Sequence, residues 1–252
     1  MTAQGAAARV AFRPARPSPG RMARVSTILC AADPAGSPAA IERLVAAAEE
    51  HDTDAIAVVG DLSEGANPEG YRTLFHALAA TGKPAYYVPG PSDAPLDAYY
   101  REAHAAEATH PTLRGVHGTA ALTPDNHIAV AGMGGEIADD PLTGRDESGR
   151  LRYARVEAEY RLKVLDDLGE HERVLLFWSR PAHKHQGDGG SETVAELVNT
   201  YRPRLAVCDG GRGTETLGKH SLVVAPGSLR DGHYALIDLQ RRSVELPEAA
   251  AR

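Results

Sequence analysis

Acidic side chains follow three apolar segments of this chain, at the points where those segments end. Asp33 follows the first segment, Asp61 the second and Asp93 the third. Ligands of parallel α/β sheets bind beyond the carboxyl ends of the strands, so we expect these carboxylates near one edge of a sheet. Carboxylate oxygens suit a hard divalent cation. Asp also caps backbone amides in strand-to-helix turns, so a structural role for the series is as well supported as a functional one.

The elements that would position these acids alternate between apolar segments and helical patterns. Ser-Pro at residues 37–38 and Asn-Pro at residues 67–68 each place an N-cap residue before proline, which predicts helices that run to about His51 and Ala80. The segments before, between and after these helices are mainly apolar, which is typical of strands in a parallel sheet covered on both faces. The predicted strands are Val25–Cys30, Ala55–Val59 and Ala85–Val88.

The second half of the chain predicts further strands and helices. Residues 134–150 are rich in glycine and acids and are expected to form a loop. The sequence has no internal repeat and no linker, so one α/β domain is expected. The predicted helices are 94–105, 156–168 and 191–199, and the predicted strands are 116, 120–122, 128–132, 174–178 and 205–208. The segments 221–225, 234–239 and 243–246 are expected to form an antiparallel meander with Gly and Pro turns.

The composition is that of a globular chain, with 252 residues of which 42% are hydrophobic and 24% charged. A net charge of −7 argues against a general nucleic-acid binder, which usually carries a basic face. It also leaves little to attract an anionic membrane surface. No segment approaches the roughly 18 apolar residues that a membrane-spanning helix needs. We therefore expect neither a nucleic acid nor a membrane as a partner.

Residues 1–24 differ from the rest because they hold five arginines and no acid. They are expected to be either a disordered basic arm or the result of a start codon assigned too early, with Met22 as the true start. Residues 25–246 are expected to form the domain and residues 247–252 a tail. The arm lacks the apolar region of a secretory signal, so a cytoplasmic location is expected, with Cys30 and Cys208 as buried thiols.

The order and spacing of five loops resemble those of the calcineurin-like metallophosphoesterases, in particular the small bacterial phosphodiesterases. The resemblance spans roughly residues 25–239. It implies a four-layer α/β/β/α sandwich that carries a two-metal site built from Asp, Asn and His side chains. The segments that carry it are Asp33-Pro34-Ala35, Gly60-Asp61, Gly90-Pro91-Ser92-Asp93, residues 175–181, residues 205–212, and Ala225-Pro226-Gly227-Ser228, which is similar to the Asn-Pro-Gly-Ser of that group.

The ligand positions implied by this resemblance are only partly filled. Asp33 and Asp61 fall on metal ligands, and Asp61 falls on the one that bridges both ions. Asp93 falls on the acid that orients the catalytic histidine. Two of the seven implied metal ligands are therefore present. The five other ligand positions hold Ala35, Pro91, Trp178, Gly210 and Arg212, and Ser92 stands in place of the catalytic histidine.

Two aspartates without imidazole or amide partners are too few for a two-metal centre, which needs ions held roughly 3.5–4 Å apart. We therefore expect a degenerate metal site without a metal cofactor, in which Arg212 pairs with Asp33 or Asp61 and replaces the metals electrostatically. The expected function is that of a catalytically impaired phosphoesterase homologue that binds a small phosphorylated ligand, such as a nucleotide, or a partner. The residues expected to bind it are Asp33, Asp61, Ser92, Trp178 as a stacking platform, Arg180 and Arg212.

Two alternatives remain open. An active phosphoesterase would hold Mn, Fe, Zn or Mg on Asp33 and Asp61, and would use Asp61 and Asp93 as catalytic residues. Its missing ligands would come from His183-x-His185 or His233. Solvent-exposed histidines explain that pair more simply, because nothing in the sequence fixes their partners. The second alternative is a structural or interaction protein, in which Trp178 and Arg212 merely fill the former cleft.

Overall fold

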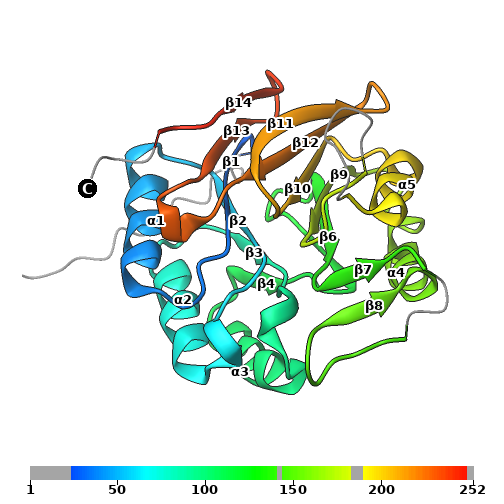
Figure 1. Cartoon of the computed structure of the whole chain (residues 1–252). Helices are drawn as coiled ribbons and strands as arrows, with labels where there is room; N and C mark the ends of the chain where they lie inside the picture. Colours follow the sequence, from blue (N-terminus) through cyan, green and yellow to red (C-terminus); the bar gives the residue numbers. More distant parts are fainter. Residues whose placement is uncertain (1–23, 141–143, 183–189, 249–252) are drawn as a thin grey trace, which may run out of the picture.

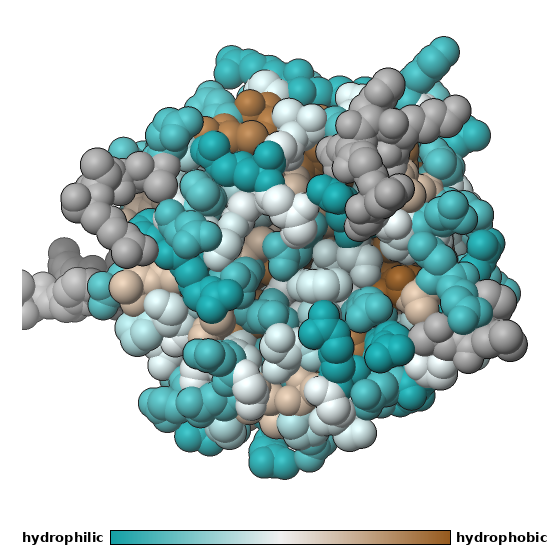
Figure 2. Space-filling model, in the orientation of Figure 1, coloured by the Kyte–Doolittle hydropathy of each residue, from teal (hydrophilic) through white to brown (hydrophobic). Residues whose placement is uncertain are grey.

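The structure is a computed structural model that describes residues 24–140, 144–182 and 190–248. The predicted basic arm, apart from Arg24, and most of the predicted tail lie outside the described residues, as does His183-x-His185. No helix in the described ranges is long and apolar enough to cross a membrane. On the face shown in Figure 2, hydrophilic residues cover most of the surface and apolar residues form small separate areas.

The first sheet contains the predicted strands that precede the three acids. β1, β2, β3 and β4 are parallel neighbours in chain order, and two C-terminal strands join antiparallel to β1 and to each other. The carboxyl ends of the parallel strands therefore meet at one edge. The strands are β1 (Thr27–Ala32), β2 (Ala55–Val59), β3 (Ala85–Tyr87), β4 (Leu113–Gly115), β13 (Ala235–Asp238) and β14 (Ser243–Glu245).

The second sheet has a parallel centre and antiparallel strands at both edges. Its order is β11-β12-β10-β9-β6-β5, with β12, β10, β9 and β6 parallel. A separate parallel ribbon, β7–β8, lies beside it (Figure 1). The strands are β5 (Thr119–Leu122), β6 (Ile128–Met133), β7 (Glu136–Ala138), β8 (Arg152–Ala154), β9 (Glu172–Phe177), β10 (Leu205–Cys208), β11 (Arg212–Leu217) and β12 (Ser221–Pro226).

The helices cover the outer faces of the two sheets. α1, α2 and α3 lie on the side of the first sheet, and α4 and α5 lie on the side of the second (Figure 1). Ser37 and Asn67 cap α1 and α2 before proline, as the sequence predicts. The helices are α1 (Pro38–Glu50), α2 (Pro68–Ala80), α3 (Leu96–Thr109), α4 (Arg155–Leu162) and α5 (Glu192–Tyr201), with 3-10 turns η1 (Glu64–Ala66), η2 (Pro91–Asp93), η3 (Lys163–Leu165) and η4 (Leu229–Asp231).

Apolar side chains between the two sheets and under the helices on both outer faces hold this arrangement together, because successive strand residues point to opposite faces. In β1, Ile28 and Cys30 belong to the layer between the sheets, while Leu29 and Ala31 belong to the layer under the helices. Both cysteines are buried, and burial raises the pKa of the Cys208 thiol to about 12. The predicted four-layer α/β/β/α sandwich and the predicted buried thiols are confirmed.

Three local expectations are wrong in whole or in part. The segment 134–150 contains β7 and is not loop throughout, and Val116, expected in a strand, lies between β4 and β5. The C-terminal meander forms only in part, because β13 and β14 pair antiparallel in the first sheet while β12 lies in the second. The chain changes sheets at Gly227, whose φ of +85° a residue with a side chain would adopt only with strain.

Candidate functional site

The loop after β1 holds Asp33 in an ion pair. Its Oδ2 accepts hydrogen bonds from the Ser228 hydroxyl (2.9 Å) and from Arg230 Nη2 (2.8 Å) and Nε (3.1 Å). Arg230 lies in η4, which the sheet change at Gly227 brings to the end of β1, where Ala32 bridges to Ser228. The second carboxylate oxygen, Oδ1, is buried and has no hydrogen-bond partner in the described residues. The guanidinium group of Arg230 thus pairs with one carboxylate oxygen of Asp33, and the other oxygen is left without a described partner.

The loop after β3 packs directly on Asp61. The Ser92 amide donates a hydrogen bond to Asp61 Oδ1 (2.8 Å), while Ser92 itself is exposed. A Cβ on Gly90 would lie 2.2 Å from Asp61 Oδ1 and 2.4 Å from the Asp61 amide nitrogen, so this close approach requires glycine at position 90. One carboxylate oxygen of Asp61 is therefore already bound by the backbone amide of Ser92.

Asp93 is fully buried and organises the two loops. Its carboxylate accepts hydrogen bonds from the amides of Leu62 (2.8 Å), Ser63 (2.9 Å) and Gly90 (2.7 Å), and from the Tyr71 hydroxyl (2.8 Å). Burial raises the pKa of Asp93 to about 7, and the four donated hydrogen bonds oppose that rise because they favour the ionised form. The side chain ties the loop after β2 to the loop after β3 and does not reach solvent.

Trp178 and Asp209 lie at the carboxyl ends of two strands of the second sheet. Trp178 follows β9, and Asp209 follows β10. Both pack over Gly60, where a Cβ would lie 3.1 Å from Asp209 Oδ2 and 3.2 Å from Trp178 Cδ1. Burial raises the pKa of Asp209, and the Asp33 and Asp61 carboxylates add to the rise, while a hydrogen bond from the Gly210 amide opposes it. Asp209 is therefore a third carboxylate near Asp33 and Asp61.

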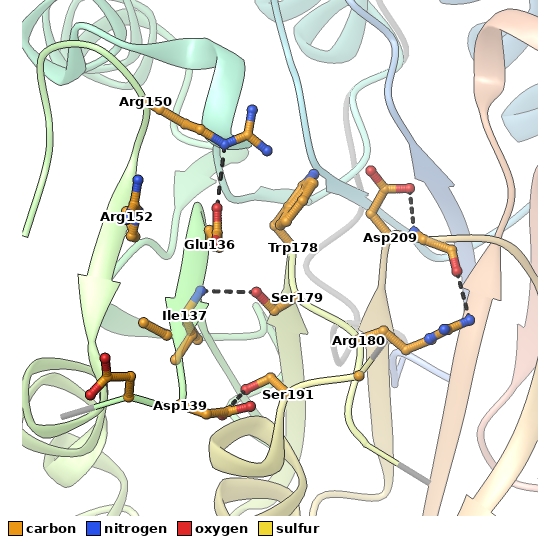
Figure 3. Close-up of a pocket in the computed structure, with 14 residues that line it drawn as sticks. Glu136, Ile137, Asp139, Arg150, Arg152, Trp178, Ser179, Arg180, Ser191 and Asp209 are labelled. Atoms are coloured by element: carbon orange, nitrogen blue, oxygen red, sulfur yellow. Dashed lines mark hydrogen bonds and ion pairs between the residues drawn. The ribbon is translucent and has the colours of Figure 1, made fainter. Parts of the chain in front are cut away.

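A cavity of about 550 Å³ opens on the far side of Trp178, between the β7–β8 ribbon and the ends of β9 and β10 (Figure 3). Arg150 lies over the Trp178 ring, with Cζ 5.8 Å from the ring centroid, and its Nε lies 3.3 Å from Glu136 Oε2. The Ile137 amide donates to Ser179 Oγ (2.9 Å), which fastens the ribbon to β9. The lining residues are Glu136, Ile137, Ala138, Asp139, Asp140, Arg150, Arg152, Trp178, Ser179, Arg180, Gly190, Ser191, Asp209 and Gly210.

Asp139 joins the end of the ribbon to the start of α5. Its carboxylate accepts hydrogen bonds from Ser191 Oγ (2.8 Å) and from the amides of Thr193 (2.8 Å) and Glu192 (3.0 Å) (Figure 3). Burial would raise the pKa of Asp139, but these donors outweigh it and lower the pKa below its usual range. Asp139 is therefore occupied as a helix cap and holds one wall of the cavity in place.

The expected pairing of Arg212 with Asp33 or Asp61 is wrong. Arg212 Nη2 donates to the carbonyls of Leu246 (2.8 Å) and Pro247 (2.7 Å), because β11 runs along the sheet edge and carries the side chain toward the C-terminal segment. Arg230 is the arginine that pairs with Asp33. Of the six residues expected to bind the ligand, Trp178 and Arg180 line one cavity, whereas Asp33, Asp61, Ser92 and Arg212 do not line it.

Sequence reasoning missed several of these groups. Arg150 and Arg152 alternate with Leu151 and Tyr153, and that alternation was a signal for a strand with one buried face. Asp209 follows a buried strand, which the strand-end argument used for the other acids would also have selected. Nothing in the sequence distinguished Arg230 from other surface arginines, because its role depends on where the chain crosses between the sheets.

The described residues contain no group of three or more His, Cys, Asp or Glu side chains arranged to hold a metal ion. His233, one of the proposed relocated ligands, packs against Gly227 in the turn that carries Ser228. The fit to a metal pair is poor at three further points: Arg230 occupies one oxygen of Asp33, the Ser92 amide occupies one oxygen of Asp61, and Trp178 stands beside Asp209.

Comparison with known proteins gives a family and several similar structures. The sequence profile of the metallophosphoesterases of the calcineurin superfamily matches residues 67–249. The crystal structure of TT1561 from Thermus thermophilus is 40% identical and covers 90% of this chain and 100% of its own, with a TM-score of 0.85.

Two more distant structures share the fold. A dimetal phosphatase from Danio rerio is 12% identical, covers 84% of this chain and 92% of its own, and has a TM-score of 0.57. A 5'-nucleotidase from Candida albicans SC5314 is 10% identical, covers 87% of this chain and 50% of its own, and has a TM-score of 0.54. No curated protein matches the sequence significantly.

Proposed function

Because this chain belongs to the calcineurin superfamily of metallophosphoesterases, we propose that it binds a small phosphorylated molecule and that its hydrolytic activity is impaired. The ligand would lie at the carboxyl ends of the β-strands, where members of an α/β fold bind their ligands. The proposal has two parts, the loss of the two-metal centre and the presence of a cavity suited to an anion.

The first part rests on the groups that stand at the implied metal positions. A two-metal centre needs several ligands that hold the ions roughly 3.5–4 Å apart. Here the Arg230 guanidinium pairs with Asp33 at 2.8 Å and brings a permanent positive charge to the place of a dication. Pro91 has no side-chain donor or acceptor, and Trp178 cannot coordinate a metal. We propose that these residues do not assemble the family's metal pair.

The second part rests on one observation, which carries the proposal. The cavity beside Trp178 is lined by the side chains of Arg150, Arg152 and Arg180 and by an indole. Its volume of about 550 Å³ lies within the roughly 300–1,000 Å³ of small-molecule sites. Guanidinium groups bind phosphate through paired hydrogen bonds, and aromatic rings contribute apolar contact area.

Thermal unfolding of the purified protein tests this function. We expect phosphate, ribose 5-phosphate and adenosine 5'-monophosphate to raise the Tm in a concentration-dependent way, because a ligand of the folded state stabilises it by mass action. The uncharged adenosine should stabilise it less at the same concentration. If no phosphorylated compound shifts the Tm at millimolar concentration, the proposed function is wrong.

A second candidate, an active metal-dependent phosphoesterase, is favoured by a different observation. Asp33 Oδ1 is buried without a described partner, and the Asp61 carboxylate lies close enough to Asp209 to contribute to the raised pKa of Asp209. Stoichiometric Mn, Fe, Zn or Mg in untagged protein, lost in Asp61→Asn, would support it. So would hydrolysis of bis(p-nitrophenyl) phosphate that depends on Asp61. Absence of both, in protein that still binds phosphate, supports the first function.

A further inference from the structure

The acids that line the cavity beside Trp178 already have partners. Glu136 pairs with Arg150, and Asp139 caps α5. Asp209 accepts a hydrogen bond from the Gly210 amide (2.6 Å), and Asp140 also takes part in an interaction. Few carboxylate oxygens in the cavity are therefore left to neutralise a further cationic side chain.

Two guanidinium groups on the same cavity lack such a partner. Arg152 makes no ion pair with any described residue, and its buried Nε has no hydrogen-bond acceptor among them. Glu136, its neighbour across the β7–β8 ladder, pairs with Arg150 instead. Arg180 donates to the Gly210 carbonyl (3.0 Å) and makes no ion pair within the described ranges. An unpaired, partly buried guanidinium is costly, and a bound anion would remove that cost.

Trp178 supplies a flat apolar surface on the same cavity. The residue is half-buried, and Figure 3 shows its ring between Arg150 and Glu136 on one side and Asp209 on the other, with Arg180 farther along the same wall. A ring system that lay against the indole would exclude water from apolar area and add a stacking interaction. The cavity therefore combines a stacking surface with two guanidinium groups.

We propose, building on the function above, that this cavity binds a molecule with a planar ring and a phosphate group, of the class of a mononucleotide. The ring lies against Trp178, and the phosphate is held by Arg152, which lies in β8, and by Arg180, which follows β9. The ligand thus occupies a site displaced from Asp33 and Asp61. Arg152 determines the affinity for the phosphate, and Trp178 determines the preference for a ring.

The chain contains a single tryptophan, so its fluorescence reports directly on this site. We expect adenosine 5'-monophosphate to quench the Trp178 emission and ribose 5-phosphate to bind with little quenching. Calorimetric titration gives the affinities. Arg152→Gln should weaken adenosine 5'-monophosphate binding at least tenfold and leave adenosine binding unchanged. Arg152→Lys keeps the positive charge but not the planar guanidinium group, and its affinity for adenosine 5'-monophosphate should fall less than that of Arg152→Gln.

Three variants complete the test, and circular dichroism verifies that each is folded. Trp178→Leu should weaken adenosine 5'-monophosphate severalfold and leave inorganic phosphate unaffected. Arg212→Gln is the matched control, since its guanidinium points to the C-terminal segment, and it should bind like the wild type. If Arg230→Gln abolishes phosphate binding while Arg152→Gln does not, the ligand lies beside Asp33, and this inference fails while the proposed function stands. If no phosphorylated probe binds, both fail.

Discussion

The charged groups at the carboxyl ends of the strands differ between the two sides of the molecule in whether the protein itself provides their partners. On the first sheet, Asp33, Asp61 and Asp93 all accept hydrogen bonds from groups of the protein itself. On the other side, Arg152 in the β7–β8 ribbon and Arg180 after β9 of the second sheet face a cavity without a carboxylate partner in the described residues. Groups that the protein has already satisfied do structural work. Groups that it leaves unsatisfied on a cavity are the better candidates for binding.

Removal of the Asp93 carboxylate should have the largest effect. Asp93→Ala leaves three buried amides and the Tyr71 hydroxyl without their acceptor. We expect a loss of about 3–5 kcal/mol in the free energy of unfolding, measured by urea denaturation. Tyr71→Phe, which removes one donor only, should cost about 1 kcal/mol. A loss below about 1 kcal/mol in Asp93→Ala would show that the first-sheet loops do not depend on this carboxylate.

The free energy of unfolding should fall at low pH through His117, which contacts Tyr153 in the strand that carries Arg152. His117 is 4% exposed, and it bonds to Tyr153 Oη (3.1 Å) and accepts from the Gly134 amide (3.0 Å). Burial, with the nearby Arg161 and Arg145, lowers the pKa of His117 to about 3. The unfolded chain binds this proton near pH 6.5, so stability is lost as the pH falls below that value, by about 2 kcal/mol between pH 8 and pH 5.

Urea denaturation of wild type and His117→Gln at several pH values isolates this contribution, since the other titrating groups are common to both. The difference between the two free energies of unfolding should shrink as the pH falls from 8 to 5. A difference that stays constant over that range would mean that His117 does not resist protonation in the folded state.

Arg230→Met should remove the ion pair of Asp33 on the first-sheet side. The variant leaves Asp33 Oδ2 with only the Ser228 hydroxyl, beside the Asp61 and Asp209 carboxylates. We expect a loss of about 1 kcal/mol of stability, because the pair is partly exposed. Removal of one positive charge should also raise the affinity for Mn²⁺ about tenfold in calorimetric titration, equivalent to roughly 1.4 kcal/mol. An unchanged Mn²⁺ affinity would argue against Arg230 as the resident counter-charge.

Arg212→Gln should have the smallest effect. Its hydrogen bonds go to the carbonyls of Leu246 and Pro247 at the sheet edge, away from both regions. We expect a change of less than about 0.5 kcal/mol in stability, measured by thermal denaturation. A large loss of stability would mean that the C-terminal segment contributes more to the fold than its hydrogen bonds indicate.

The sequence predicts the elements well where one local signal decides the outcome. Proline after an N-cap residue marks the start of α1 and α2, and continuous apolar segments mark β2 and β10. The strand-end acids follow from these elements. The fold and the positions of Asp33, Asp61 and Asp93 were therefore predictable.

The partners of those acids were not predictable, because they depend on contacts between distant segments. Asp33 binds Arg230, which lies 197 residues later in the chain. Arg230 is in η4, just after the chain has changed sheets at Gly227. The alternation of residues 150–153 indicates one strand of the ribbon that carries Arg152, but nothing in the sequence identifies the three-residue strand with which it pairs. Arg212 fell on a family position in the sequence, but as part of an edge strand it points elsewhere.

The hydrogen bonds of Asp93 bear on how related sequences should be compared. An acid that fixes the backbone of two loops is needed for the fold whether or not any reaction takes place, so its retention in a relative carries no information about turnover. The side chains of Pro91 and Ser92 make no hydrogen bond of this kind to the described residues. A survey of relatives should therefore sort chains by the residues at these two positions, and by whether an arginine accompanies Asp33, to separate hydrolases from binding proteins.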